Sequence, residues 1–209
     1  MKFFHVGDLH LGKQLHGYDL IKDQEHMLEE LLSYIKKEQP DAVLIAGDIY
    51  DRAVPSGTAM QLLEQFFIQA DELAKEQKAV EIILIAGNHD AAKRLQYGSS
   101  FMKRHHIHIA VMPPQQEDAY LEQVTLTDQE GVVHFYLLPY TKPGMIRHWV
   151  EQEELANTQD AVKFLLERET IDWNERNVLL SHQFYLHANE DTVLCDSETP
   201  SFSVGGLDS

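Results

Sequence analysis

Apolar and polar residues alternate in blocks along the first half of the chain. Apolar segments over 2–7, 42–46 and 80–86 each end at or just before a glycine, and a polar cluster follows each one. A continuous apolar run is typical of a strand buried on both faces. Apolar residues recur at helical spacing over 22–38 and again after Ser56, a suitable N-cap residue. This alternation of strands and helices predicts a parallel or mostly parallel sheet.

The second half of the chain predicts shorter elements. A helix near 93–105 is followed by short segments separated by turns, which predict a second and more antiparallel sheet. These segments lie near 107–111, 121–127 and 132–138. Two helices and an apolar run are expected near 144–150, 158–168 and 177–180. From Asn189 onward no element is indicated. The sequence contains no repeat or linker, so residues 1–209 are expected to form one domain without a second.

Composition and charge narrow the class of protein. Hydrophobic residues make up 44% and charged residues 24% of the chain, which is ordinary for a soluble globular protein. No apolar stretch approaches the roughly 20 residues of a membrane span, and the first apolar segment is too short for a signal peptide. The single cysteine, Cys195, excludes an internal disulfide. We therefore expect no membrane association and a cytoplasmic location.

The net charge of −17 argues against a broad basic face that binds nucleic acid. It does not exclude an enzyme that meets phosphates through bound metal ions, because those ions supply the local positive charge. The one basic cluster, Lys103 to His108, has two interpretations: a contact to DNA phosphates or a solvated helix end. The apolar side chains of Leu62, Leu63, Phe66 and Phe67 suit a dimer face, but a helix packed on the sheet explains them first.

Ligand-type side chains follow four of the predicted strands. They are Asp8 and His10, then Asp48 and Asp51, then Asn88, His89 and Asp90, and finally His182. In an α/β sheet, ligands bind outside the carboxyl ends of the strands. Oxygen and imidazole donors suit Mn²⁺, Fe²⁺ or Zn²⁺, whereas the lack of cysteine ligands argues against a structural zinc site. Each group alone is also compatible with a turn, a loop or a buried core histidine. Together they favour a metal centre.

The order and spacing of these groups resemble the motif set of the calcineurin-like metallophosphoesterases. The matching stretches are Asp8-Leu9-His10, Gly47-Asp48-Ile49-Tyr50-Asp51, Gly87-Asn88-His89-Asp90 and His182. The longer stretches around 5–18 and 43–52 resemble the SbcD group of bacterial DNA-repair nucleases. This resemblance implies an α/β fold in which a two-sheet β-sandwich is flanked by helices. Gly7 stands where that group usually has serine. The final Gly-His-x-His motif is absent before Ser209, so we expect the domain to lack its C-terminal part.

The resemblance also implies site roles. Two divalent ions are expected, with Mn²⁺ favoured over Fe²⁺, Zn²⁺ or Mg²⁺. Asp8 and His10 would hold the first ion, Asn88 and His182 the second, and Asp48 would bridge the two. The ions would share a hydroxide for in-line attack on phosphorus. His89 would donate a proton to the leaving oxygen, with Asp51 as its support. Arg52 would contact a substrate phosphate or form a salt bridge.

Three functions follow as hypotheses. The first is a DNA nuclease subunit that works with an SbcC-like ATPase of the SMC type and forms a homodimer in the full-length protein. The second is a phosphoesterase for nucleotides or other small esters, because the same ligands serve both substrate classes. The third is a non-catalytic scaffold with an incomplete metal site, which the missing Gly-His-x-His makes a real alternative.

Overall fold

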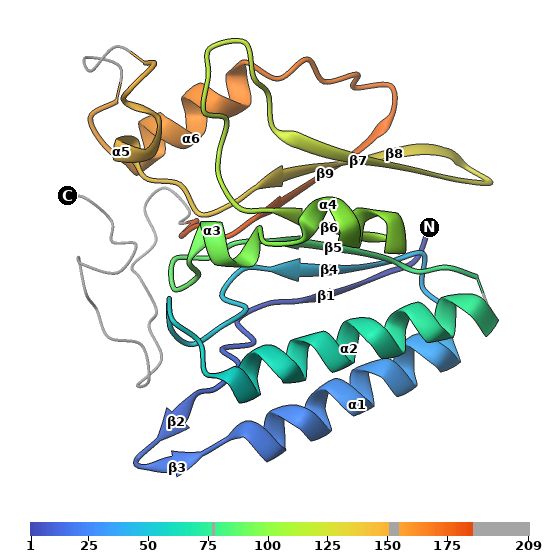
Figure 1. Ribbon diagram of the computed structural model, residues 1–209. Coiled ribbons are helices and arrows are strands. Elements are labelled where there is room, and N and C mark those ends of the chain that lie inside the picture. The colour runs from blue at the N-terminus through green and yellow to red at the C-terminus, as the bar shows by residue number, and fades with distance from the viewer. Residues whose placement is uncertain (77, 151–154, 186–209) are drawn as a thin grey trace.

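The computed structural model describes residues 1–76, 78–150 and 155–185. Its first half forms a four-stranded parallel sheet with the strand order β1-β4-β5-β6 (Figure 1). The strands are β1 (Phe3–Val6), β4 (Ala42–Ala46), β5 (Glu81–Ile85) and β6 (Ile107–Ala110). The helices α1 (Ile21–Glu38) and α2 (Gly57–Glu76) cover one face of this sheet. The predicted parallel sheet is therefore confirmed.

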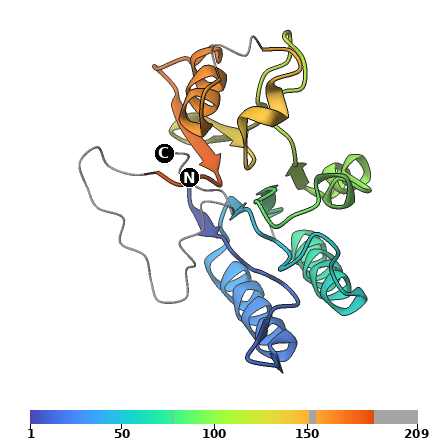
Figure 2. The same cartoon turned by 90° about the vertical axis from the view of Figure 1, so that its left-hand side faces the viewer.

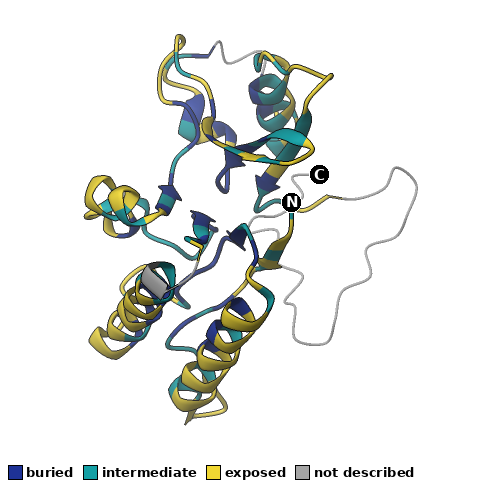
Figure 3. Cartoon of the chain, turned by 90° about the vertical axis from the view of Figure 1, so that its right-hand side faces the viewer, coloured by how far each residue is buried: buried dark blue, intermediate teal, exposed yellow. Residues whose placement is uncertain are grey.

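A three-stranded sheet of order β7-β8-β9 covers the other face. It contains β7 (Glu122–Asp128), β8 (Gly131–Leu138) and β9 (Arg176–Ser181). The helices α5 (Pro143–Ile146) and α6 (Thr158–Glu167) pack on its outer side. The chain thus stacks a helical layer, two sheets and a second helical layer, and this arrangement is visible from the side in Figure 3. The expected two-sheet sandwich flanked by helices is confirmed.

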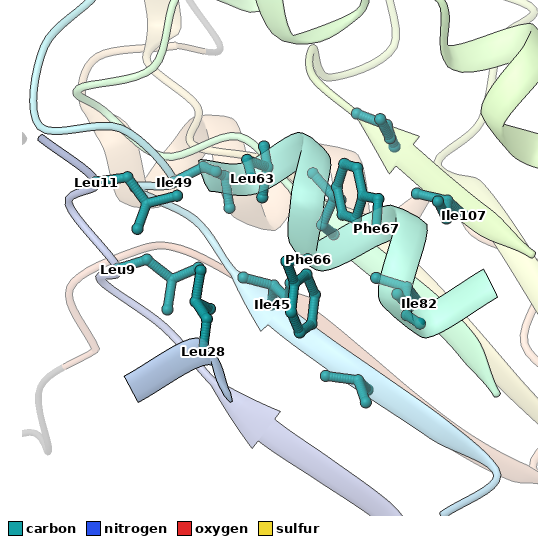
Figure 4. Packing of buried hydrophobic residues seen from close by; sticks show 14 of the residues in the cluster. Leu9, Leu11, Leu28, Ile45, Ile49, Leu63, Phe66, Phe67, Ile82 and Ile107 are labelled. Atoms are coloured by element: carbon teal, nitrogen blue, oxygen red, sulfur yellow. The ribbon is translucent and has the colours of Figure 1, made fainter. Parts of the chain in front are cut away.

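Apolar side chains fill each of the three interfaces between these layers. In the largest, Phe66 of α2 and Leu28 of α1 lie against Ile45 of β4 (Figure 4). Leu63, Phe66 and Phe67 are all buried, so they belong to the core rather than to a dimer face. Ser56 caps α2 as predicted, because its Oγ accepts a hydrogen bond from the Ala59 N–H at 3.1 Å.

Several sequence-based boundaries were wrong. The segment near 107–111 pairs with β5 in the parallel sheet and is not part of the second sheet. The helix expected over 93–105 is divided into α3 (Ala92–Leu95), α4 (Ser99–Met102) and η1 (Lys103–His105), because Gly98 adopts a left-handed conformation (φ 78°) between the first two. The helix expected over 144–150 has regular α geometry only in α5. The second sheet is mixed, since β8 and β9 run parallel.

A short hairpin of β2 (Gln14–Leu15) and β3 (Tyr18–Asp19) was not predicted. Cys195 and the stretch from Asn189 onward lie outside the described residues. Within the described part of the chain, no helix is long and apolar enough to cross a membrane.

Replacing Phe66 by alanine tests the interface between α2 and the sheet. The side chain is 1% exposed, so its loss should leave a cavity and lower the free energy of unfolding by about 3–5 kcal/mol, as measured by urea denaturation. Ile68→Ala on the same helix is the control, because Ile68 is 44% exposed and should cost about 0.5 kcal/mol or less. Equal losses in the two variants would contradict this packing.

Candidate metal centre

The predicted ligands meet at one edge of the molecule, where the parallel strands end. Figure 2 looks onto this edge. Asp8 follows β1, Asp48 follows β4, and Asn88 with His89 follows β5. His182 directly follows β9 of the second sheet. The site therefore lies where the two sheets come together, and its predicted ligands come from segments as far apart in the sequence as Asp8 and His182.

Two of the ligand-bearing loops run side by side beyond their strands. The N–H groups of Asp8 and His10 donate to the carbonyls of Gly47 (3.2 Å) and Asp48 (2.9 Å). Asp8, His10 and Asp48 all have positive φ, between 43° and 54°. This left-handed conformation costs a non-glycine residue on the order of 1–3 kcal/mol and persists only where surrounding contacts impose it. The backbone is therefore strained at these three predicted metal-ligand positions.

Two glycines leave room for the ligand side chains. A Cβ at Gly47 would lie 2.4 Å from Nδ1 of His182, and a Cβ at Gly87 would lie 2.1 Å from Oδ1 of Asp48. Gly47 also has φ 80°, which a side chain disfavours. The glycines that end these strands are thus required because functional side chains occupy the space beside them.

Asp48 lies at the centre of the cluster and is 3% exposed. Its Oδ2 is 3.5 Å from His182 Nε2, 3.6 Å from His10 Nε2 and 4.0 Å from His89 Nε2. Its Oδ1 accepts a hydrogen bond from the His89 backbone N–H at 2.9 Å. Burial would raise the pKa of Asp48, but the contact with His182 and the His89 N–H outweigh it, so the pKa is lowered. The carboxylate is therefore held in its charged form.

The remaining predicted ligands surround this carboxylate. Asp8 Oδ1 lies 3.7 Å from His10 Nε2, and Asn88 Oδ1 lies 3.1 Å from His182 Nε2. Burial lowers the pKa of His10, and the opposing effect of Asp48 does not fully offset it. Neutral imidazole is the form that binds metal ions.

The donors fit divalent metal ions. Two groups each place three donor atoms within 4.8 Å of one another: His10, Asp48 and His89, and Asp8, Asp48 and His182. Both groups share Asp48. In addition, Nδ1 of His10 is buried without a hydrogen-bond partner among the described residues. This atom faces the Asp51 carboxylate at 3.7 Å, whereas Nε2 of the same ring faces Asp8 and Asp48.

Backbone carbonyls fix the orientation of two of the histidines. Nδ1 of His182 lies 2.7 Å from the Ala46 carbonyl, and Nδ1 of His89 lies 3.0 Å from the Asp51 carbonyl. Because a carbonyl only accepts, each Nδ1 carries the proton and each Nε2 faces Asp48. Burial would lower the pKa of His182, but its contacts with Asp48 and the Ala46 carbonyl outweigh this effect and raise the pKa.

Asp51 contacts His89 through its backbone rather than its side chain, and Arg52 forms the salt bridge that was one of its two expected roles. Asp51 supports His89 through its backbone carbonyl, while its carboxylate lies 3.7 Å from His10 Nδ1. Arg52 is 72% exposed, and its Nε lies 3.6 Å from Asp51 Oδ2. Such an exposed pair contributes little to stability. Because the side chain is exposed, its guanidinium is accessible to a ligand.

Asp90 lies beside the cluster and has a position that the sequence did not predict in detail. Its carboxylate accepts hydrogen bonds from the N–H groups of Ile49 (3.1 Å), Tyr50 (3.0 Å) and Gly87 (2.9 Å). It therefore joins the loop that carries Asp48 to the loop that carries Asn88 and His89. Burial raises the pKa of Asp90, and these three N–H groups oppose the shift without cancelling it. Its place in the Gly-Asn-His-Asp motif was the available signal.

The basic cluster from Lys103 to His108 lies away from this site, near the amino end of β5. His106 and His108 each contact Glu81, at 2.8 Å, and His105 contacts Asp71 at 3.1 Å. Burial would raise the pKa of Glu81, but the two histidines outweigh it and lower the pKa. The three histidines of the cluster are thus paired with acids, which agrees with a helix end better than with a DNA contact.

The sequence matches the calcineurin-like phosphoesterase family over residues 1–200, and the chain belongs to this family. Members of the family use divalent metals, in agreement with the two donor groups at Asp48.

Two curated relatives carry the name of the D component of the nuclease SbcCD. The chain is 32% identical to the one from Staphylococcus epidermidis over 211 residues, which cover 100% of the chain and 52% of that relative. It is 33% identical to the one from Staphylococcus saprophyticus over 184 residues, or 87% of the chain and 46% of the relative. The predicted SbcD-like resemblance is confirmed. The chain spans about half the length of these relatives.

Replacing Asp90 by asparagine should weaken the contacts between the two ligand-bearing loops without removing a predicted metal ligand. The amide keeps the shape but turns an NH₂ group toward backbone N–H donors, so the free energy of unfolding should fall by about 1–3 kcal/mol. Affinity for Mn²⁺, measured by calorimetry, should fall by about tenfold or more. Asp23→Asn, at an exposed position in the first turn of α1, is the matched control. Unchanged stability and affinity in Asp90→Asn would show that these hydrogen bonds do not support the site.

Proposed function

We propose that this chain is the catalytic part of a metal-dependent DNA nuclease. The single observation that carries the proposal is the pair of donor groups that share Asp48 at the carboxyl ends of the strands. Curated relatives that are named as part of a nuclease support the choice of DNA as substrate. Bound metal cations would supply the positive charge that attracts phosphates, which a chain of net charge −17 lacks.

Asp48 would hold both ions, because a carboxylate offers two anionic oxygens. Asp8 and His10 would complete one ion's set, and Asn88 and His182 the other's. This pairing differs from the two donor groups, which place His10 with His89 and Asp8 with His182 around the same Asp48. The central position of Asp48 supports this assignment. When bound, two ions activate water and neutralise charge on a phosphate during in-line displacement. Mn²⁺ is our proposed metal, and Fe²⁺, Zn²⁺ and Mg²⁺ suit the same donors.

His89 would act as the general acid. Its Nδ1 proton is held by the Asp51 carbonyl, which turns Nε2 toward the centre. The side chain is 37% exposed, so a substrate can reach it, whereas Asp48 is buried. A proton on Nε2 would then be available to the leaving oxygen. Arg52 would contact a phosphate oxygen from the exposed rim.

His89→Ala separates this role from that of a ligand, since Nε2 of His89 also belongs to one donor group. We expect the variant to keep both metal sites, measured by calorimetry, and to lose at least ~10²-fold in the rate of phosphodiester cleavage. His26→Ala, at an exposed position on α1, is the control. Joint loss of metal and activity would instead make His89 a ligand.

The substrate class is tested with linear duplex DNA and a cyclic nucleotide, each with Mn²⁺. We expect cleavage of the DNA. Cleavage of the cyclic nucleotide alone would reject the nuclease and support the phosphoesterase. A chain that binds no Mn²⁺ and cleaves neither substrate would support the scaffold.

The whole protein's assembly is also a proposal. An SbcC-like ATPase of the SMC type is the partner suggested by the names of the relatives, which describe one component of SbcCD. The homodimer and the cytoplasmic location stay predictions. Co-expression with such an ATPase, followed by co-purification and sedimentation, tests both the partner and the dimer.

A further inference from the structure

Gln24, near the start of α1, reaches into the loop that carries His10. Its Nε2 donates hydrogen bonds to the carbonyls of Leu9 (3.1 Å) and His10 (2.8 Å). Its Oε1 accepts one from the N–H of Gly12 at 2.9 Å. One half-buried amide therefore satisfies three backbone groups within four residues of the loop. An amide offers two N–H donors and an oxygen acceptor at the end of one side chain, which matches two carbonyls and one N–H.

These hydrogen bonds complement those on the other side of the loop. The N–H groups of His10 and Leu11 donate to the carbonyls of Asp48 and Ile49. The Leu11 carbonyl accepts from the N–H of Asp51. Gln24 engages other groups, the two carbonyls that precede Leu11 and the N–H that follows it. His10 thus lies between two sets of backbone hydrogen bonds, one from the neighbouring strand end and one from a helix.

The loop needs this support because its conformation is unfavourable. His10 is a non-glycine residue with φ 43°, and its ring is turned toward Asp48. Gly12 has φ 87°, and a Cβ there would lie 3.1 Å from Ala59 of α2, so α2 limits the loop as well. Without the amide, the carbonyls of Leu9 and His10 would each lose a hydrogen bond, and the His10 carbonyl would keep only the one from the Lys13 N–H. The loop could then relax toward a less strained form.

We propose that Gln24 is a positioning residue that holds His10 in its ligating conformation and so sets the metal affinity of the donor group that contains His10. The inference rests on the proposed metal centre. Gln24 contacts none of the donor atoms itself; it acts through the backbone on either side of the imidazole. Metal affinity is consequently the property that should report on it.

Two substitutions test the role. Gln24→Glu keeps the shape and the acceptor but cannot donate to the carbonyls, and Gln24→Met keeps similar bulk without hydrogen bonds or charge. Mn²⁺ binding to the metal-free 209-residue chain is measured by calorimetry and by electron paramagnetic resonance. We expect at least one Mn²⁺ site to weaken by about tenfold or more in both variants. Cleavage activity should recover when Mn²⁺ is raised, because the donors are all still present.

Gln65→Glu is the matched control, since it makes the same change at an exposed position on α2 and should bind Mn²⁺ as the unmodified chain does. Unchanged Mn²⁺ affinity in Gln24→Glu and Gln24→Met would overturn the inference, and so would a lower melting temperature of the metal-free chain with affinity intact. If the unmodified chain binds no Mn²⁺, the proposed metal centre fails and the inference fails with it. Binding by the unmodified chain with equal binding by the variants rejects the role of Gln24 alone.

Discussion

The carboxylate of Asp48 is the group on which the arrangement of the site depends. A buried charge without partners would cost several kcal/mol, and Asp48 is 3% exposed. Its neighbours are the rings of His10 and His182 and the backbone N–H of His89, which come from three different strand ends. The charge is compensated only when those strand ends are aligned. The same alignment brings the metal donors together, so the stability of the edge and its chemistry have one structural cause.

For every donor except His182, the alignment follows from the parallel sheet. β1, β4 and β5 pair in register, and the backbone hydrogen bonds between the first two continue beyond the strands into the loops. The helices do not take part in this strand pairing, because most of their contacts are with the face of the sheet. They act on the loops through single polar side chains instead. Gln24 does so from α1, whereas Asp90 joins two of the loops directly.

The sequence predicted those parts of the molecule that depend on local pattern. Three of the parallel strands and the polar residues that follow them were predicted because an apolar run followed by Gly-Asp or Gly-Asn is visible in a short window. The assignment of these polar residues as metal ligands stays a prediction. The strand β6 was assigned to the wrong sheet, since a short apolar segment does not show which neighbour it pairs with. The hairpin at 14–19 and the role of Gln24 were missed, because both depend on contacts that the apolar pattern does not encode. Asp51 was identified, but which of its oxygens faces His89 is set by the loop's backbone.

His182 differs from the other donors because it belongs to the second sheet. The two sheets also meet through apolar side chains such as Leu44, Ile83 and Phe135, which form no directional bonds. An ion coordinated by both Asp48 and His182 would act as a directional cross-link between these layers, with a fixed bond length that apolar packing lacks. Ion binding would then change how strongly the second sheet, together with the helices α5 and α6 packed on it, is held against the first sheet.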